Sequence, residues 1–334
     1  MPSVCVFDPG MSNRQGQPSA NLGDVIIQKS VERELVALFP QHRFVRVSTH
    51  ESPAREEIDA AARSQYIIVG GSNIVGSYSY FYREWKIGVR EIRRLRGRVI
   101  LFGCGWGWYQ RRPTLPARMM LLALLSRDHL HSVRDTYTLR HLQALGFQNV
   151  VNTACPTLWP LVVPVKHDSP SQRNEVVLTT VTDYRKDGAT DRTTLDLILS
   201  HYRHAYIWLQ GAGDEAYFHS MAGDLASRVT VIPHSYDAFE TFLKDGPSFD
   251  YIGTRLHGGI RWLTAGKQAL IISVDNRAAE LARDTGLPTV QRGDYASIVS
   301  WINHPRKLLM HLPVSEISRW SQQFDAPRIE QACS

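Results

Sequence analysis

The chain has 334 residues, which is enough for two domains of ordinary size that each bury a core of their own. Hydrophobic residues make up 43% and charged residues 21%, a balance that is typical of globular proteins and excludes a mainly disordered chain. The net charge of +6 favours anionic partners, such as an acidic polymer or a small anionic substrate.

No segment of the sequence predicts export or a membrane span. The N-terminus lacks a basic region followed by an apolar one, so we expect no signal peptide and a cytoplasmic protein. The longest strongly apolar run, residues 119–125, is too short to cross a bilayer and predicts a buried helix, with contact to a membrane surface as the alternative. We therefore expect at most a peripheral association with a membrane.

The distributions of cysteine and arginine also limit the function. Cys5, Cys104, Cys155 and Cys333 are widely separated, so neither a disulfide framework nor a zinc site is predicted, and we expect reduced thiols and no metal. Arginines cluster in residues 90–98, a pattern that can indicate nucleic-acid binding. The same pattern fits the solvated end of a helix, which we favour, so we expect no nucleic-acid partner.

Short apolar runs alternate with helical patterns from the N-terminus onward. A helix is predicted at residues 25–38, because apolar residues recur there at intervals of three and four, with Asp24 as its N-cap. A second helix is predicted at residues 136–145, between Asp135 as N-cap and Gly146 as left-handed C-cap. Strands are predicted at residues 4–7, 44–47, 66–69, 99–102, 131–133 and 150–152.

The polar, proline-containing residues 161–175 predict a linker, after which the alternation starts again. Helices at residues 258–265 and 277–285 are among those expected in this second half. A last helix at residues 314–324 is expected to pack back across the domain boundary. Strands are predicted at residues 176–181, 206–209, 229–232, 251–253, 269–274 and 289–290.

Regular alternation of strands and helices predicts parallel sheets covered by helices on both faces. We therefore expect an α/β fold of two doubly wound, Rossmann-like domains at residues 1–160 and 176–310, followed by a C-terminal helix and tail at 311–334. Ligands of such folds bind beyond the carboxyl ends of the strands. The site is therefore expected in a cleft between the two domains.

The most informative segment is residues 249–260, where an apolar strand ends and a helix begins around Arg255, Leu256 and His257. Unpaired N–H groups at a helix start favour an anion, and Arg255 can add a bidentate grip on a carboxylate or phosphate. His257 can donate a proton or a hydrogen bond near neutral pH. The alternative is structural: Arg255 pairs with a neighbouring carboxylate, and His257 caps the helix.

Two regions of the first half carry further candidates. A long polar loop, residues 9–20, leads to Asn21, Gly23 and Asp24, and Asp24 is either a general base or an N-cap, or both. Arg134 follows the strand at residues 131–133, where it points into the cleft or pairs with Asp135 at the surface.

The glycine-containing segments 70–73 and 103–108 also end strands, and their glycines allow a ligand to approach the backbone closely. Neither matches the dinucleotide-binding Gly-X-Gly-X-X-Gly pattern after a first strand, and tight turns explain both. Trp106 and Trp108 are expected in the core. The motifs of serine hydrolases, zinc proteases and P-loop proteins do not occur, so these classes are unsupported.

The order of these motifs resembles that of the polysaccharide pyruvyl transferases. It comprises Asn-Leu-Gly-Asp at residues 21–24, Gly-Gly-Ser at 70–72, Val-Arg-Asp at 133–135 and Thr-Arg-Leu-His at 254–257. Residues 265–272, 275–277 and 286–288 are similar to that family's C-terminal signature, so the resemblance covers about residues 21–290. Two positions depart from the family pattern: Ser72 replaces the third glycine, and Cys155 precedes Pro156 where an aspartate is usual.

The resemblance implies a fold similar to the GT-B glycosyltransferases and transfer of a pyruvyl group from phosphoenolpyruvate to sugar hydroxyls, which gives a pyruvate ketal. It implies donor contacts from Arg255, Leu256 and His257 in the second domain, with Arg134 as a further anion-binding candidate. His257 would be the acid or a phosphate ligand, and Asp24 the base. Asn21 and Gly23 join the candidate binding residues on the acceptor side. No metal or further cofactor is needed, and the partner is a saccharide, free or lipid-linked.

Two other classes of protein remain open from the sequence. A GT-B-type glycosyltransferase that uses a nucleotide sugar would share the fold and an anion site at the helix after residue 255. Such enzymes commonly place an acidic residue a few positions into that helix, and residues 258–262 contain none. The third class is a carbohydrate-binding relative without catalytic activity.

Overall fold

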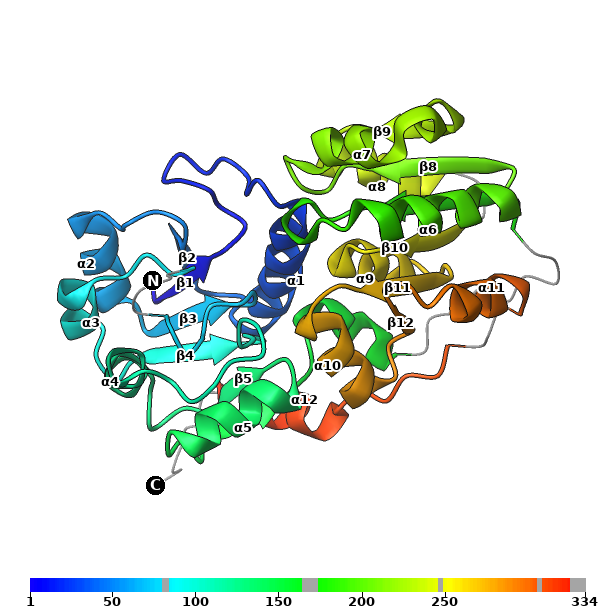
Figure 1. Cartoon of the computed structure of the whole chain (residues 1–334). Helices are drawn as coiled ribbons and strands as arrows, with labels where there is room; N and C mark the ends of the chain where they lie inside the picture. The colour runs from blue at the N-terminus through cyan, green and yellow to red at the C-terminus, as the bar shows by residue number, and fades with distance from the viewer. Residues whose placement is uncertain (80–83, 164–173, 246–248, 305–307, 325–334) are drawn as a thin grey trace, which may run out of the picture.

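The computed structural model describes residues 1–79, 84–163, 174–245, 249–304 and 308–324. Two α/β halves lie side by side, with the N-terminal half on the left and the C-terminal half on the right of Figure 1. All twelve predicted strands are present, each within two residues of its predicted bounds. Most of the predicted linker, residues 164–173, and the tail from residue 325, which includes Cys333, lie outside the described residues.

The first half is built on parallel strands in the order β2-β1-β3-β4, and a bridge between Cys104 and Val133 joins the parallel pair β5-β6 to β4. The chain order reverses between β1 and β3, which makes this point the topological switch point of the sheet. The strands are β1 (Ser3–Asp8), β2 (Arg43–Ser48), β3 (Tyr66–Gly70), β4 (Val99–Phe102), β5 (His131–Val133) and β6 (Val150–Asn152). The helices are α1 (Leu22–Leu38), α2 (Arg55–Arg63), α3 (Val89–Arg94), α4 (Leu115–Leu124) and α5 (Thr136–Ala144).

The second half has one parallel sheet in the order β12-β11-β10-β7-β8-β9, with its switch point between β7 and β10. Its strands are β7 (Val176–Thr180), β8 (His204–Trp208), β9 (Val229–Ile232), β10 (Asp250–Gly253), β11 (Ala269–Ser273) and β12 (Thr289–Gln291). Its helices are α6 (Gly188–His201), α7 (Asp214–Ala222), α8 (Tyr236–Asp245), α9 (Leu256–Thr264), α10 (Asn276–Thr285) and α11 (Tyr295–Asn303). Three 3-10 helices complete the described chain: η1 (Pro156–Val162), η2 (Asp183–Arg185) and η3 (Gly223–Arg228).

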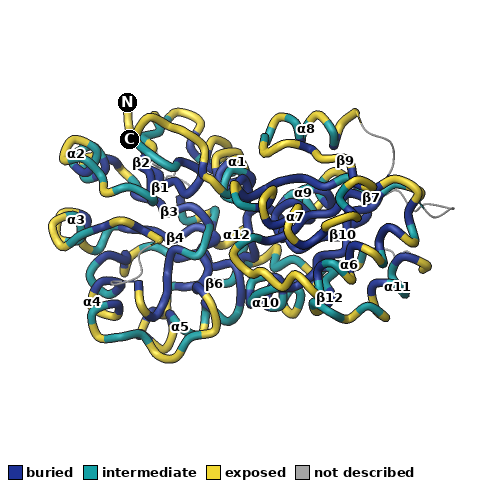
Figure 2. Tube along the Cα trace, turned by 45° about the horizontal axis from the view of Figure 1, so that its top comes forward, coloured by how far each residue is buried: buried dark blue, intermediate teal, exposed yellow. Residues whose placement is uncertain are grey.

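Helices cover both faces of each sheet, as the alternation predicts. In the first half, Ile58 of α2, Leu95 at the end of α3, and Leu121 of α4 belong to the core on one face of the sheet. Val31 of α1 and Ile68 belong to the core on the other face. Figure 2 shows the result, with dark blue buried strands inside and yellow exposed turns on the outer helices. Two hydrophobic layers per sheet explain why the strands are apolar along their whole length.

The two halves share a core. Helix α1 belongs to the first domain and also packs against the second. Leu22 and Ile26 of α1 pack in one cluster with Leu256 and Ile260 of α9. The last helix, α12 (Val314–Gln322), follows the second domain but packs on the first. Its Trp320 stacks on Phe102 of β4, with ring centroids 4.3 Å apart, which confirms the predicted return across the boundary.

The start of α1 differs from the prediction. The helix begins at Leu22, and its N-cap is Asn21, whose side chain accepts a hydrogen bond from the Gly23 N–H at 3.1 Å. Asp24 therefore lies inside the first helical turn and is not the N-cap. Asparagine and aspartate cap helices about equally well, so the backbone path of the preceding loop decides which of the two is used. The carboxylate of Asp24 is left for other contacts.

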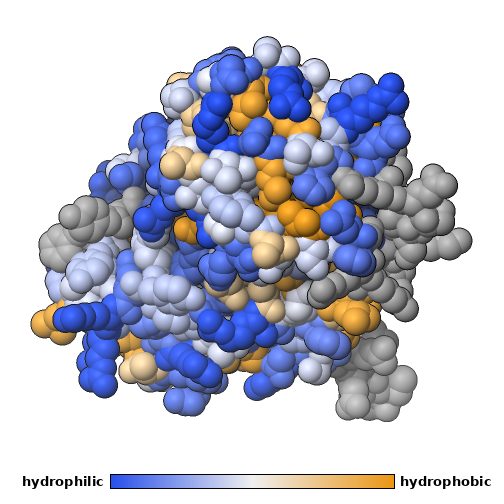
Figure 3. Space-filling view, turned by 45° about the vertical axis from the view of Figure 1, so that its right-hand side comes forward, coloured by the Kyte–Doolittle hydropathy of each residue, from blue (hydrophilic) through white to orange (hydrophobic). Residues whose placement is uncertain are grey.

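The surface in Figure 3, where the C-terminal side comes forward, is mostly hydrophilic, with hydrophobic side chains gathered in a band in its upper part. Among the residues that the structure describes, no helix combines the length and the apolar composition that a membrane span requires.

Candidate active site between the two sheets

Loops that follow strand ends of both halves meet at one place. Asn21 forms an antiparallel bridge with Gly211, which lies beyond the carboxyl end of β8. The Leu22 N–H donates to the Gln210 carbonyl at 3.0 Å, and the Ala212 N–H donates to the Ala20 carbonyl at 2.9 Å. The start of α1 lies beside the switch point of the first sheet, between β1 and β3. This junction brings it to the loops around the switch point of the second sheet, between β7 and β10.

Arg255 is buried and fully engaged with carboxylates of its own half. Its Nε donates to the Val181 carbonyl at 2.9 Å and to Asp214 Oδ2 at 3.0 Å, and its Nη2 donates to Asp183 Oδ1 at 2.8 Å and to Asp214 Oδ1. Burial by itself lowers the pKa of Arg255, but Asp214 raises it above the ordinary value. Burial raises the pKa of Asp214, and Arg255 opposes that rise. The structural alternative from the sequence, an Arg–carboxylate pair, is thus present at Arg255.

The fit of Arg255 against the backbone gives a prediction on stability. A Cβ added at Gly211 would lie 2.1 Å from Arg255 Nη2 and 3.0 Å from Asp214 Oδ1, so Gly211→Ala must displace the guanidinium. Asp214, which is fully buried, would lose its partner, and we expect the free energy of unfolding to fall by about 3 kcal/mol or more. Gly188→Ala is the control, because its Cβ would meet only Met221 Cβ at 3.7 Å. Equal urea midpoints for the two variants would contradict this account.

His257 lies in the first turn of α9, nearly inaccessible to solvent, and its side chain does not cap that helix. Its Nε2 is 3.9 Å from Cys155 Sγ, in the loop after β6 of the other half. Burial, followed by the positive charges of Arg277 and Arg134, holds the pKa of His257 well below its usual value. His257 is therefore a neutral imidazole at neutral pH, and Cys155 occupies the place beside it where the family pattern has an aspartate.

Arg277 is the site residue that the sequence reasoning missed. It follows β11 at the start of α10, as Arg255 follows β10 at the start of α9. Its Nε donates to both oxygens of Asp275 at 3.1 and 3.0 Å, and its Nη2 contacts the Tyr184 hydroxyl. The Tyr184 ring lies between the guanidinium groups of Arg255 and Arg277, at 5.2 and 5.5 Å from its centroid. The pattern of a strand end followed by a helix start applies equally to Arg277 and would have found it.

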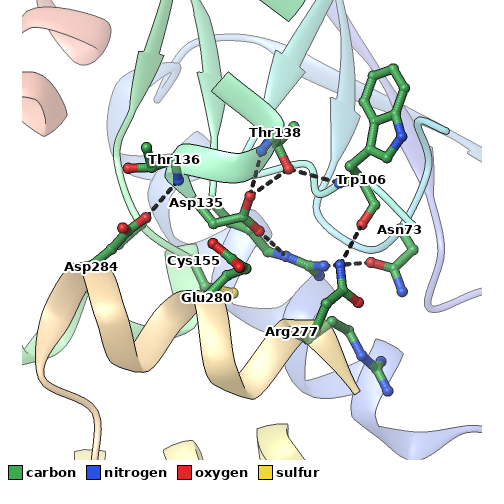
Figure 4. A network of polar contacts seen from close by, with 12 residues as sticks. Asn73, Trp106, Asp135, Thr136, Thr138, Cys155, Arg277, Glu280 and Asp284 are labelled. Atoms are coloured by element: carbon green, nitrogen blue, oxygen red, sulfur yellow. Dashed lines mark hydrogen bonds and ion pairs between the residues drawn. The ribbon is translucent and has the colours of Figure 1, made fainter. Parts of the chain in front are cut away.

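Arg134 is also buried, so it forms no surface pair. Its Nε donates to Asp135 Oδ2 at 3.2 Å, and its Nη2 donates to Asn73 Oδ1 (Figure 4). Asp135 also caps α5 as predicted, because Oδ1 accepts from the Thr138 N–H at 2.7 Å. A Cβ at Gly105 would lie 2.2 Å from the Arg134 guanidinium carbon, so only glycine leaves room for this arrangement. Arg134 is held in place from the first half, and its charge acts on His257.

Asp24 lies beside the switch point of the first sheet, between β1 and β3. Its carboxylate accepts hydrogen bonds from Ser19 Oγ at 3.2 Å and from Ser72 Oγ at 3.4 Å. Burial raises the pKa of Asp24 above its usual value, while the charges of His50 and Arg277 oppose that rise. Arg277, from the second half, therefore acts on Asp24 as well as on His257. Asp24 and His257, which the sequence singled out separately, share this one neighbour.

The remaining predicted binding residues have structural roles. Leu256 is buried in the core that the two halves share. Asn21 caps α1, and its side-chain oxygen accepts from Gln210 Nε2 at 3.0 Å. A Cβ at Gly23 would lie 2.7 Å from the same Gln210 nitrogen, so a larger residue there would displace the Gln210 amide.

Strained backbone gathers on the loops around these residues. Among the described residues, Ser72, Trp108 and Ala154 are the non-glycine residues with left-handed backbone, at φ of 59°, 55° and 58°. They follow β3, β4 and β6, next to Asp24, the Arg134 network and Cys155. Such conformations cost of order 1–3 kcal/mol each and are concentrated at functional sites.

A pocket of about 390 Å³ opens beside this network, lined by residues that include Asn73, Glu84 and Trp108. Asn73 lines the pocket and also belongs to the Arg134 network, since it accepts the hydrogen bond from Arg134. Trp106 is buried as expected, but Trp108 is 44% exposed, which corrects the prediction of a core residue. The Arg185 guanidinium of the second half lies 4.1 Å from the Trp108 ring centroid, so the second half contacts one of the residues that line the pocket.

No group of three or more histidine, cysteine, aspartate or glutamate side chains suited to a metal ion occurs within the described ranges. The described cysteines, Cys5, Cys104 and Cys155, are free and buried.

Two parallel-sheet, Rossmann-like domains that contact each other at the carboxyl ends of their strands define the GT-B-type class of fold. The model of the polysaccharide pyruvyl transferase family matches residues 21–276, most of the chain, and the chain belongs to this family. It is accordingly a transferase that acts on polysaccharides or their precursors.

Solved structures with this fold include sugar-nucleotide enzymes. The UDP-GlcNAc 2-epimerase of Methanocaldococcus jannaschii, in complex with UDP-GlcNAc and UDP, has a TM-score of 0.53 and 10% identity over 95% of this chain and 99% of its own. The heptosyltransferase WaaC of E. coli, with ADP-2-deoxy-2-fluoro heptose, has a TM-score of 0.40 and 12% identity over 91% and 99%. From the first likeness we take the fold alone. A comparison with curated protein sequences gives no match.

Proposed function

We propose that the chain transfers the pyruvyl group of phosphoenolpyruvate to two hydroxyls of a saccharide, which forms a pyruvate ketal. The family supports this donor, and one observation in the site supports it further. Arg134 from the first half and Arg277 from the second both act on the buried imidazole of His257. A site with converging positive charge and a neutral histidine suits a small donor that carries a carboxylate and a phosphate.

The start of α9 adds to this positive potential. No side chain caps α9 among the residues that the structure describes, so no capping side chain competes with an anion for its first backbone N–H groups. Arg255 is the N-cap residue, but its guanidinium is neutralised by Asp214 and Asp183. Arg277 and Arg134 each pair with one carboxylate, that of Asp275 and that of Asp135, whereas Arg255 pairs with two. We therefore assign the direct grip on the donor to Arg277 and Arg134.

The proposed reaction needs one acid and one base. A bound donor brings negative charge next to His257, which raises the pKa of His257, and the imidazolium then protonates C3 of the enol. A saccharide hydroxyl attacks C2 and gives its proton to Asp24, whose raised pKa makes it a better base near neutral pH. A second hydroxyl then attacks C2 as the C2–O bond to phosphate breaks. The proton of this hydroxyl goes to the departing phosphate, which leaves as hydrogen phosphate when the ketal closes. No metal or cofactor enters this scheme.

The pocket at Asn73 and Trp108 suits the acceptor. An exposed tryptophan offers a flat apolar face, and Asn73 and Glu84 offer polar groups for sugar hydroxyls. Its contact with the Arg134 network would place an acceptor hydroxyl next to the donor. The acceptor is a saccharide of a polysaccharide or its precursor.

A nucleotide-sugar glycosyltransferase is the second candidate, because the fold is the same. Against it, α9 carries no carboxylate with which to hold a donor ribose. The deciding experiment is calorimetric titration of the protein with phosphoenolpyruvate and, separately, with UDP and UDP-GlcNAc, beside an assay of phosphate release in the presence of saccharides. We expect binding of phosphoenolpyruvate alone. Binding of the nucleotides alone would overturn the proposal, and binding of none would favour a carbohydrate-binding relative.

A further inference from the structure

Positive charge is concentrated in one stretch of the chain that the proposed reaction does not use. Residues 88–127 contain nine arginines and a single acidic residue, Glu91, so this stretch alone carries more positive charge than the net +6 of the whole chain. The stretch combines two features, the arginine cluster at residues 90–98 and the apolar run at residues 119–125. In the structure they lie on helices that contact each other.

The stretch forms α3 and α4, which lie in contact at the end of the molecule that points away from the C-terminal half (Figures 1 and 2). Arg90, Arg93 and Arg94 of α3 are exposed there. Together with Arg55 and Arg63 of α2 they line an open groove of about 890 Å³ between α2 and α3. Asp59 and Glu91 are the acidic residues that line it.

Large apolar side chains are also exposed on these two helices. Val89 at the start of α3 is 49% exposed, and Leu115 and Met119 of α4 are 69% and 61% exposed. Leu115 and Met119 are one helical turn apart and share a face, with exposed Arg118 between them in the sequence. The apolar run was expected to form a buried helix; α4 buries Met120 and Leu124 but presents Met119 to solvent.

We infer that α3 and α4 dock on the surface of an anionic lipid bilayer through these exposed arginines and apolar side chains. Arginines attract acidic headgroups, and apolar side chains exposed on the neighbouring helix enter the boundary between headgroups and acyl chains. RNA or an acidic polymer would be attracted by the arginines, but neither gives Leu115 and Met119 an apolar environment. The inference is independent of the donor proposed above, and it places the transferase at a surface where lipid-linked saccharides are found.

The test is co-sedimentation of the whole chain with vesicles of phosphatidylcholine, with and without phosphatidylglycerol. We expect binding only when phosphatidylglycerol is present, and loss of binding at high salt, because the charges are exposed. The combined change Arg90→Glu, Arg93→Glu and Arg94→Glu should weaken binding at least tenfold. Leu115→Ser with Met119→Ser, which leaves the charge unchanged, should weaken it about tenfold.

The matched control reverses the same number of exposed cations in the second half: Arg203→Glu, Arg228→Glu and Lys244→Glu. It should bind the vesicles like the wild type. Equal loss in the control would overturn the inference, since net charge alone would then explain binding. So would unchanged binding after Leu115→Ser with Met119→Ser, or tighter binding to an RNA oligonucleotide than to the vesicles, because either result would indicate a soluble polyanion as the partner.

Discussion

His257→Gln is expected to lower turnover by about 10²–10⁴-fold, the range for the loss of a group that transfers a proton. Glutamine fills a similar volume and keeps a hydrogen-bonding group beside Cys155, so the fold should stay that of the wild type, and the affinity for phosphoenolpyruvate should fall much less than turnover. His304→Gln, at an exposed position, is the control and should keep full activity. Steady-state kinetics with circular dichroism checks this result, and full turnover by a folded His257→Gln would remove His257 from the reaction.

The same histidine predicts a dependence on pH. Without donor, burial and the two arginines hold the pKa of His257 far below 6.5, so it is unprotonated at pH 7. Negative charge of the bound donor raises that pKa, so binding takes up protons and the affinity should rise as the pH falls. Calorimetry in buffers of different ionisation enthalpy measures this uptake. It should be smaller in His257→Gln, and equal uptake in the two proteins would place the proton elsewhere.

Asp24→Asn is expected to reduce turnover by a similar factor, about 10²–10⁴-fold, with donor affinity changed at most a few-fold. Asparagine can keep hydrogen bonds to Ser19 and Ser72 but cannot accept the hydroxyl proton. Because Asn21 caps α1, the change removes no cap and should leave the stability nearly unchanged. The wild-type rate should fall as the pH falls through the raised pKa of Asp24, since the carboxylate is then protonated.

Asp294→Asn is the matched control for this variant. Asp294 caps α11 on the surface of the second half, and asparagine caps equally well, so both stability and turnover should stay at the wild-type level. A loss of turnover in Asp24→Asn that is no larger than in Asp294→Asn would leave Asp24 without a catalytic part. Such a result would not bear on the proposed donor site, because donor affinity and turnover are measured separately.

The elements of the fold could be predicted because they depend on neighbours in the chain. An apolar run flanked by turn residues specifies a buried strand, and a period of three to four specifies an amphipathic helix. The caps at Asp135 and at Gly286, which has a left-handed φ of 74°, follow from the same local rules. Asp24 shows the limit of these rules, because Asn21 and Asp24 both suit the cap and only the path of the loop chooses between them.

The sequence by itself determined the alternation of strands and helices, the family, and the set of polar residues at strand ends. The tertiary structure alone decided which of them act together, because their partners are distant in the chain. Arg255 meets Asp183 and Asp214 because the order β10-β7-β8 places the loops after these strands side by side. His257 meets Cys155 and the charge of Arg134 only because the two halves pack against each other. Burial then raises the pKa of Asp24 and lowers that of His257, and burial is a property of the packed molecule that no single segment carries.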